Sequence, residues 1–250
     1  ADATWLPTPA LELTAGARVL IEKRRSGYEN VQPNSRILAG LGIFSSLLGT
    51  ANTAGRRFTA SQSYSAILPR FNALLRVSDT LNLYGTVSKG RRSPVVQVDA
   101  QSAGGVVIPR VQLVPEENVW NFEAGVKIAS RTLTGTLSAF YQSYRGFQVS
   151  VIGSDGIART QSAGSAKNPG VELEATWRPV SALSLFGAFA YLDGKIDRNN
   201  SLAPAFSGAR FGLQPQYTAS GGATLRLPLG EGMTFYATPS ATYQSKVFFE

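Results

Sequence analysis

The sequence contains no cysteine and no histidine among its 250 residues. A chain without thiols or imidazoles cannot build a disulfide framework, a thiolate zinc site, a Ser-His-Asp triad or a Cys-His dyad. Charge is also scarce, because Asp, Glu, Lys and Arg together make up 16% of the residues, against about a quarter in soluble domains. These absences exclude much of enzyme chemistry, and we predict no metal ligand and no cofactor.

Carboxylate-only acid–base chemistry is the catalytic possibility that remains. Asp79 with Glu123, or Glu172 with Glu174, could in principle act as acid and base. Carboxylates that alternate along a strand, however, usually belong to a polar sheet face. We therefore predict no catalytic residue and no enzyme activity.

The sequence also lacks an apolar run long enough for a transmembrane helix. The run at 37–48 is shorter than the about 20 residues that a helical span needs. We expect a loop helix, or a loop folded back on the rest of the protein, at this place.

The sequence is rich in two-residue alternation of apolar and polar side chains, which is the period of a β-strand. The pattern recurs at 11–22, 120–128, 171–178 and 217–227, and none of these apolar faces carries a charge. After Thr132, for example, one face consists of Leu133, Gly135, Leu137, Ala139 and Tyr141. The pattern predicts an all-β fold.

Lipid on the apolar side would explain why charge is missing from it. Arg or Lys on the lipid side of a membrane barrel costs about 2–4 kcal/mol at the midplane, whereas the lumen side tolerates charge. Segments 132–149, 181–196 and 233–248 keep the strand pattern for the about 9–11 residues that a tilted membrane strand needs. A soluble sandwich also alternates, but its strands usually run about 5–6 residues.

The connections between the strands support the same interpretation, because short and long ones alternate. Outer-membrane barrels have short periplasmic turns and long extracellular loops. The short connections lie at 7–9, 78–80, 130–132, 179–181 and 229–232, and the long ones at 25–60, 92–117, 153–168 and 197–213. We expect a bulge or a strand end at Pro69 and at Pro239, because proline cannot donate to a ladder.

The predicted fold is a transmembrane, antiparallel, up-and-down β-barrel, with about ten strands in this chain. The chain begins at Ala1 without Met or a signal peptide and ends at Glu250 inside strand pattern. We therefore expect a fragment whose sheet stays open.

Six short motifs occur in a fixed order along the chain. They are 67–71 (ILPRF), 81–94 (LNLYGTVSKGRRSP), 115–127 (PEENVWNFEAGVK), 138–144 (SAFYQSY), 163–175 (AGSAKNPGVELEA) and 243–247 (YQSKV). In this order they resemble the barrel of TonB-dependent receptors. The resemblance is clearest over 64–250, and residues 1–63 share only the general strand form.

The resemblance implies that 1–250 is part of a 22-stranded barrel domain whose plug, early strands and final strands are missing. It implies a multi-pass protein of the Gram-negative outer membrane that imports a scarce nutrient. A ferric siderophore is the expected ligand, with cobalamin, haem and carbohydrate as alternatives. The TonB–ExbB–ExbD complex of the inner membrane would supply energy through the missing N-terminal part. In such a receptor the barrel is a scaffold, and long outer loops capture the ligand.

Charged residues predicted to face the lumen are candidates to contact the plug. The other interpretation is general lumen polarity, satisfied by water or by neighbouring strands. The candidates are Arg18, Arg70, Arg76, Glu123, Lys127, Glu172, Glu174 and Arg178.

Basic residues cluster where strands enter the long loops, and two interpretations stay open for them. They could attract an anionic ligand, or pair with the phosphates of lipopolysaccharide in the surrounding lipid. Their distribution over separate loops argues against nucleic acid. The ligand-binding candidates are Arg56, Arg57, Lys89, Arg91, Arg92 and Arg110.

Aromatic residues at strand ends are expected to form interface girdles, with Trp120 and Trp177 near opposite rims. Two other classes of protein remain as alternatives to a receptor. One is a passive porin or structural outer-membrane barrel, which needs no plug. The other is a soluble β-rich adhesin or carbohydrate-binding module, which would be soluble without detergent.

Overall fold

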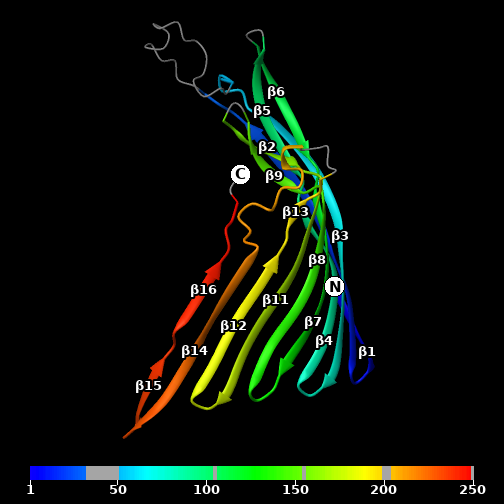
Figure 1. The fold of residues 1–250 in the computed structure, drawn as a ribbon. Coiled ribbons are helices and arrows are strands. Elements are labelled where there is room, and N and C mark those ends of the chain that lie inside the picture. Colours follow the sequence, from blue (N-terminus) through cyan, green and yellow to red (C-terminus); the bar gives the residue numbers. More distant parts are fainter. Residues whose placement is uncertain (32–50, 104–105, 154–155, 199–203, 249–250) are drawn as a thin grey trace.

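A single curved antiparallel sheet dominates the computed structural model, which describes residues 1–31, 51–103, 106–153, 156–198 and 204–248 (Figure 1). Ten strands follow one path, and each is hydrogen-bonded to the next. Along the path they are β1 (Asp2–Thr8), β2 (Leu11–Tyr28), β3 (Phe58–Ser78), β4 (Leu81–Arg92), β7 (Glu117–Ala129), β8 (Leu133–Arg145), β11 (Ser165–Val180), β12 (Leu183–Leu192), β14 (Tyr217–Gly230) and β15 (Met233–Ala237). The predicted up-and-down order is confirmed, and the sheet does not close into a barrel.

The short connections all lie at one end of the sheet, which is the lower end in Figure 1, and the long ones lie at the other. The upper connections carry secondary structure that the sequence pattern did not predict. They contain the hairpin β5 (Val95–Ala103) and β6 (Val106–Val114), the hairpin β9 (Gln148–Ile152) and β10 (Ala158–Ser162), strand β13 (Lys195–Ile196) and the 3-10 helix η1 (Pro204–Phe206).

Three predicted long strands are interrupted in the structure. Segment 132–149 divides into β8 and β9, and segment 181–196 divides into β12 and β13. Segment 233–248 divides into β15 and β16 (Ser240–Gln244), which both pair with β14. In the first two segments the strand of the main sheet is shorter than the alternation suggests, because the pattern continues into the upper connections. In the third, both pieces stay in the main sheet and the edge strand breaks between them.

The prediction for Pro239 is confirmed and that for Pro69 is wrong. Pro239 lies between β15 and β16, where the edge strand breaks. Pro69 lies inside β3, opposite Ala17 of β2, without a shift in register. The ladder from β3 to β4 runs no further than Arg70 opposite Ser88, so the missing N–H of Pro69 interrupts no bond to β4.

The two faces of the sheet differ as the alternation predicts. On the apolar face, cross-strand neighbours form continuous rows, one of which joins Ala73, Gly85, Ala124, Ala139 and Val171 on successive strands. Large side chains on this face are exposed. Among the exposed ones are Val19 (66%), Ile21 (81%) and Ile67 (64%).

Small residues leave a shallow groove of about 940 Å³ on this face, between projecting aromatic rings such as those of Trp5, Phe71 and Phe122. Trp120 and Trp177 lie at opposite ends of the apolar face, close to where the strands enter the upper and lower connections. An exposed apolar face of this extent is what a membrane-spanning wall needs, since its side chains contact lipid.

The main buried cluster in the described residues lies in the upper connections and not under the sheet. It consists of Val149, Ala163, Ala166 and Ile196, which come from β9, the end of the β9–β10 hairpin, β11 and β13. The rings of Tyr144, Phe147 and Phe211 pack against it, and Phe147 stacks on Phe211 with 4.5 Å between ring centroids. The upper connections therefore have a small core of their own.

No helix within the described residues is long and apolar enough to cross a membrane. The predicted loop helix at 37–48 lies outside the described residues.

Candidate functional site

The polar face of the sheet carries the predicted plug-contacting residues, and half of them contact side chains of other strands. Arg76 forms an ion pair with Glu12 at 2.7 Å, and Arg70 forms one with Asp2 at 3.1 Å. Each pair joins strands of the β1–β2–β3 edge. Because these side chains are partly exposed, each pair contributes little to stability.

A second set of interacting polar side chains lies further along the same face. The Tyr84 hydroxyl donates a hydrogen bond to Glu123 at 2.7 Å, and the Lys127 ammonium lies 4.9 Å from the centroid of the Tyr84 ring. The predicted lumen residues Glu123 and Lys127 thus meet at one tyrosine. Asp79 is not part of this group, because its turn lies beside Ile128, about 17 Å along β7 from Glu123 at the usual rise per residue. The imagined Asp79–Glu123 acid–base pair is therefore absent.

Glu172 and Glu174 line a hollow of about 310 Å³ on the polar face. Both residues are exposed, and neither carboxylate has a hydrogen bond or an ion pair within the part of the chain that the structure describes. The lining of the hollow also includes the small residues Ala188 and Ala190 and several hydroxyl side chains. The hollow thus combines two unpaired carboxylates with small neighbouring side chains. Arg178 is exposed nearer the lower turn of the same strand.

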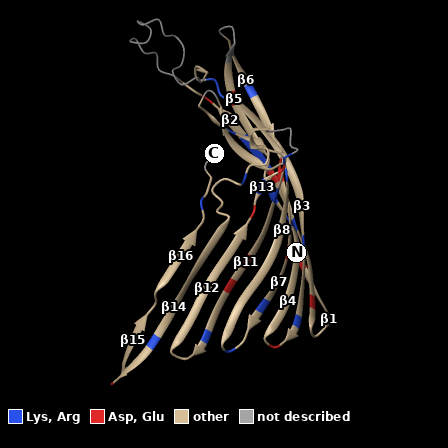
Figure 2. Ribbon diagram, in the orientation of Figure 1, with Lys and Arg blue, Asp and Glu red and all other residues tan. Residues whose placement is uncertain are grey.

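The predicted ligand-binding residues separate into different places. Arg56 lies over the Phe58 ring at 5.3 Å, Arg57 is exposed just before β3, and Arg110 is exposed on β6. Lys89 lies opposite Trp120 in a row of the apolar face. Only the run at the end of β4 brings several of the candidates together. Figure 2 shows charged residues gathered around this upper junction and near the lower turns.

Arg91 and Arg92 point to opposite sides of β4, so adjacent residues of one predicted cluster have different roles. Arg92 is exposed on the polar side, and its Nη1 donates to the Gln148 carbonyl oxygen at 3.3 Å. The side chain of Arg91 is only 1% exposed and contacts Glu116 at 2.6 Å. It also lies 6.0 Å from the centroid of the Tyr64 ring, so β3 covers it. Of the two, Arg92 is the one that a ligand in the lumen could reach.

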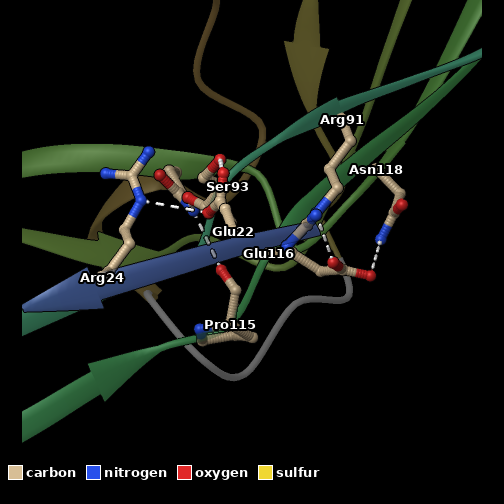
Figure 3. Close-up of polar contacts among 8 residues, drawn as sticks. Glu22, Arg24, Arg91, Ser93, Pro115, Glu116 and Asn118 are labelled. Carbon is tan, nitrogen blue, oxygen red and sulfur yellow. Dashed lines mark hydrogen bonds and ion pairs between the residues drawn. The ribbon is translucent and has the colours of Figure 1, made fainter. Parts of the chain in front are cut away.

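A polar junction surrounds Arg91 where β4 ends and β7 begins, beside Glu22 of β2 (Figure 3). The Asn118 amide donates to Glu116 at 2.9 Å, which fixes the carboxylate that faces Arg91. Where the chain leaves β4 for the upper connection, Glu22 accepts hydrogen bonds from the Ser93 hydroxyl at 2.8 Å and from Arg24 at 3.1 Å. The hydrogen bond from Ser93, together with the nearby Arg24 and Arg91 charges, lowers the pKa of Glu22.

Gln148 is a functional candidate that the sequence pattern did not reveal. Its side chain is buried, and its Nε2 donates to the carbonyl oxygens of Ser93 at 3.1 Å and Pro115 at 2.9 Å. Its backbone N–H donates to Glu117 at 2.8 Å. One glutamine thus joins both ends of the β5–β6 hairpin to the start of β9. No motif marks this residue, but two valine-rich runs flanking a Gly-Gly pair at 104–105 could have revealed the hairpin itself.

We expect Gly146→Ala to destabilise the upper junction more than Gly156→Ala does. Both glycines have a positive φ, of 69° and 73°, which costs an L-residue about 1–2 kcal/mol. A Cβ at Gly146 would also collide with the carbonyl oxygen of Glu116, whereas nothing lies near a Cβ at Gly156. Thermal unfolding of the purified full-length receptor, with each variant beside the native sequence, measures the difference. Equal melting temperatures for the two variants would contradict the close approach at Gly146.

Within the described residues, no cluster of three or more acidic side chains could hold a metal ion. Taken together, the exposed apolar face, the charged polar face and the long connections at one end define a segment of the wall of a membrane β-barrel.

The comparisons with known proteins identify the family. Residues 1–249 match the family described as "TonB dependent receptor-like, beta-barrel". The chain belongs to this family, whose barrels lie in the outer membrane of Gram-negative bacteria.

Individual relatives are more distant. The chain is 26% identical over 167 residues to the metal-pseudopaline receptor CntO of Pseudomonas aeruginosa. The matched residues make up 66% of this chain and 22% of that receptor. Its fold is similar to that of the ferric yersiniabactin uptake receptor FyuA of Yersinia pestis (TM-score 0.75, 18% identity, 100% of this chain and 34% of that one).

The ferric preacinetobactin receptor BauA of Acinetobacter baumannii has a similar fold as well (TM-score 0.63, 19% identity, 96% of this chain and 30% of that one). The chain thus spans about a fifth to a third of the length of these proteins.

Proposed function

We propose that the whole protein is an outer-membrane receptor that imports a scarce metal as its complex with a small organic chelator, and that this complex is a ferric siderophore. The chain described here forms wall and extracellular loops, and has no catalytic role. The observation that carries the proposal is the combination of an exposed apolar face with elaborated connections at one end only, in a chain of the TonB-dependent receptor family. Membership of this family favours an active receptor over a passive porin.

The class of ligand rests on the relatives. CntO, FyuA and BauA are named for metal-pseudopaline, ferric yersiniabactin and ferric preacinetobactin, and each name describes a metal carried by a chelator. The exposed arginine Arg92, on the polar face at the base of the loops, supports an anionic complex, because a guanidinium binds carboxylate or phenolate oxygens well. Arg56, Arg57 and Arg110 are further candidates on the loops.

We propose that the lumen side chains hold a plug domain supplied by another part of the protein. Glu172 and Glu174, unpaired in their hollow, are the strongest candidates for contact with basic plug residues. Import would draw on the TonB–ExbB–ExbD complex through that other part. The apolar face would contact membrane lipid, and Lys89 beside Trp120 would lie at the height of lipopolysaccharide phosphates.

Uptake of radioactive iron tests the proposal. Cells that carry or lack the gene for the full-length receptor are grown under iron limitation and given iron loaded on the siderophores that the same organism secretes. We expect uptake to fall to background without the receptor, and to fall equally when the proton gradient is collapsed. Uptake that persists without the gradient would support a passive pore instead. Uptake that is unchanged by loss of the receptor would refute an iron substrate.

A further inference from the structure

Two of the upper hairpins, β5–β6 and β9–β10, come from different connections and meet above the sheet. The first connects β4 to β7, and the second connects β8 to β11. They belong to separate two-stranded sheets, so no backbone ladder joins them. Their association therefore depends on side chains.

Gln97, the third residue of β5, makes the first of these connections. Its Nε2 donates to the Thr160 carbonyl oxygen at 2.8 Å, and its Oε1 accepts from the Thr160 N–H at 3.0 Å. The glutamine amide thus satisfies both backbone groups of one residue on β10, as a neighbouring strand would. A carboxylate or an aliphatic side chain cannot do this, because the pairing needs one donor and one acceptor.

An ion pair lies next to this contact. Both Nε and Nη2 of Arg159 donate to Oδ2 of Asp99, at 3.3 and 3.1 Å. The two side chains are 23% and 27% exposed, so solvent screens the pair only in part. Gln97 and Asp99 are two residues apart on β5, and they contact successive residues of β10.

Gln148 makes a third connection, at the base of the hairpins. It binds the carbonyl oxygens of Ser93 and Pro115, which flank the β5–β6 hairpin on either side, and it is itself the first residue of β9. Arg92 donates to its carbonyl oxygen as well. Rotation of β5–β6 against β9–β10 would therefore break contacts at two heights at once.

We propose that the β5–β6 and β9–β10 hairpins form one loop unit that moves as a single body over the mouth of the barrel. Gln97 and Gln148 are its positioning residues. A ligand that contacts either hairpin thereby displaces both, and the capturing surface is composed of two loops held in fixed relation. The role in ligand capture rests on the proposed function, whereas the coupling itself does not.

Distances between spin labels test the coupling without any ligand. Cysteines for labelling replace Ile152 on β9 and Val106 on β6, which are 74% and 61% exposed, in the full-length receptor reconstituted in nanodiscs. We expect one narrow distance distribution for the native sequence. Gln97→Ala combined with Asp99→Ala should broaden it, and Gln148→Ala should do so as well. Gln101→Ala, an exposed glutamine on the same strand, is the matched control and should leave it narrow.

A distribution that is broad in the native sequence, or that stays narrow in the Gln97 and Asp99 variant, would overturn the proposal. Iron uptake from the secreted siderophores supplies the second measurement. We expect Gln97→Ala to raise the half-saturating concentration while the maximal rate stays unchanged, and Gln101→Ala to change neither. If the distances respond as expected but the native receptor imports no iron, the coupling stands and the proposed function fails.

Discussion

Arginine in place of Ala139 is expected to reduce the amount of folded receptor in the outer membrane strongly, while arginine in place of Thr136 is tolerated. Both residues lie on β8, but Ala139 belongs to the apolar row that includes Ala124 and Gly85, whereas Thr136 faces the polar hollow. An arginine on the lipid side near the midplane costs about 2–4 kcal/mol, equivalent to a change of about 30- to 1,000-fold in the folding equilibrium.

The folded fraction is measured from the heat-dependent gel mobility of outer-membrane preparations, and from urea titration of the receptor refolded in lipid vesicles. The Thr136→Arg variant controls for the general effect of a new charge on this strand. Equal losses for the two variants would show that the two faces of the sheet do not differ in their surroundings, and would argue for a soluble sheet.

Loss of Glu116 and loss of Arg91, the two members of the buried pair, should have unequal effects on the stability of the receptor. We expect Glu116→Ala to lower the melting temperature clearly and Arg91→Met to change it little. The Arg91 side chain is 1% exposed, and two of its nitrogens already lack partners, so loss of Glu116 leaves a buried charge without compensation. Such losses typically cost about 3–5 kcal/mol. Methionine fills a similar volume without charge, and Glu116, at 37% exposed, can turn to solvent.

Thermal unfolding of the purified full-length receptor, followed by tryptophan fluorescence, measures both changes. Glu29→Ala and Arg145→Met are controls, since both residues are exposed near the same end of the sheet. A larger loss in Arg91→Met than in Glu116→Ala would show that the guanidinium stabilises the junction through contacts other than Glu116.

The wall of the barrel could be predicted from sequence because lipid imposes a simple rule on it. Residues such as Leu137, Ala139 and Tyr141 alternate with polar neighbours. Because the ladder keeps one register, this alternation decides which face of the sheet each side chain of the strand lies on. The alternation of short and long connections gave the order of strands and the end at which the loops lie. These features depend on local pattern alone, and the structure confirms them.

The upper junction could not be predicted in the same way, because its environment depends on tertiary contacts. Arg91 and Arg92 look alike in sequence. The pairing of β3 with β4 ends just before them, at Ser88, and Tyr64 of β3 then lies over Arg91 and not over Arg92. Gln148 binds carbonyl groups that are 33 and 55 residues away in the sequence, and no periodicity encodes contacts over such separations. The plug and ligand contacts proposed for the charged residues remain predictions.

The small core of the upper connections also limits which positions of the outer surface can change in sequence during evolution. Val149, Ala163, Ala166 and Ile196 are packed together from three connected segments, so replacement of one requires compensation in the others. Hairpin positions such as Ile152 and Val106 carry no such restriction, because they are exposed. Escape from antibodies or bacteriophages that recognise this end of the protein should therefore accumulate at the hairpins' exposed positions and spare the residues beneath them.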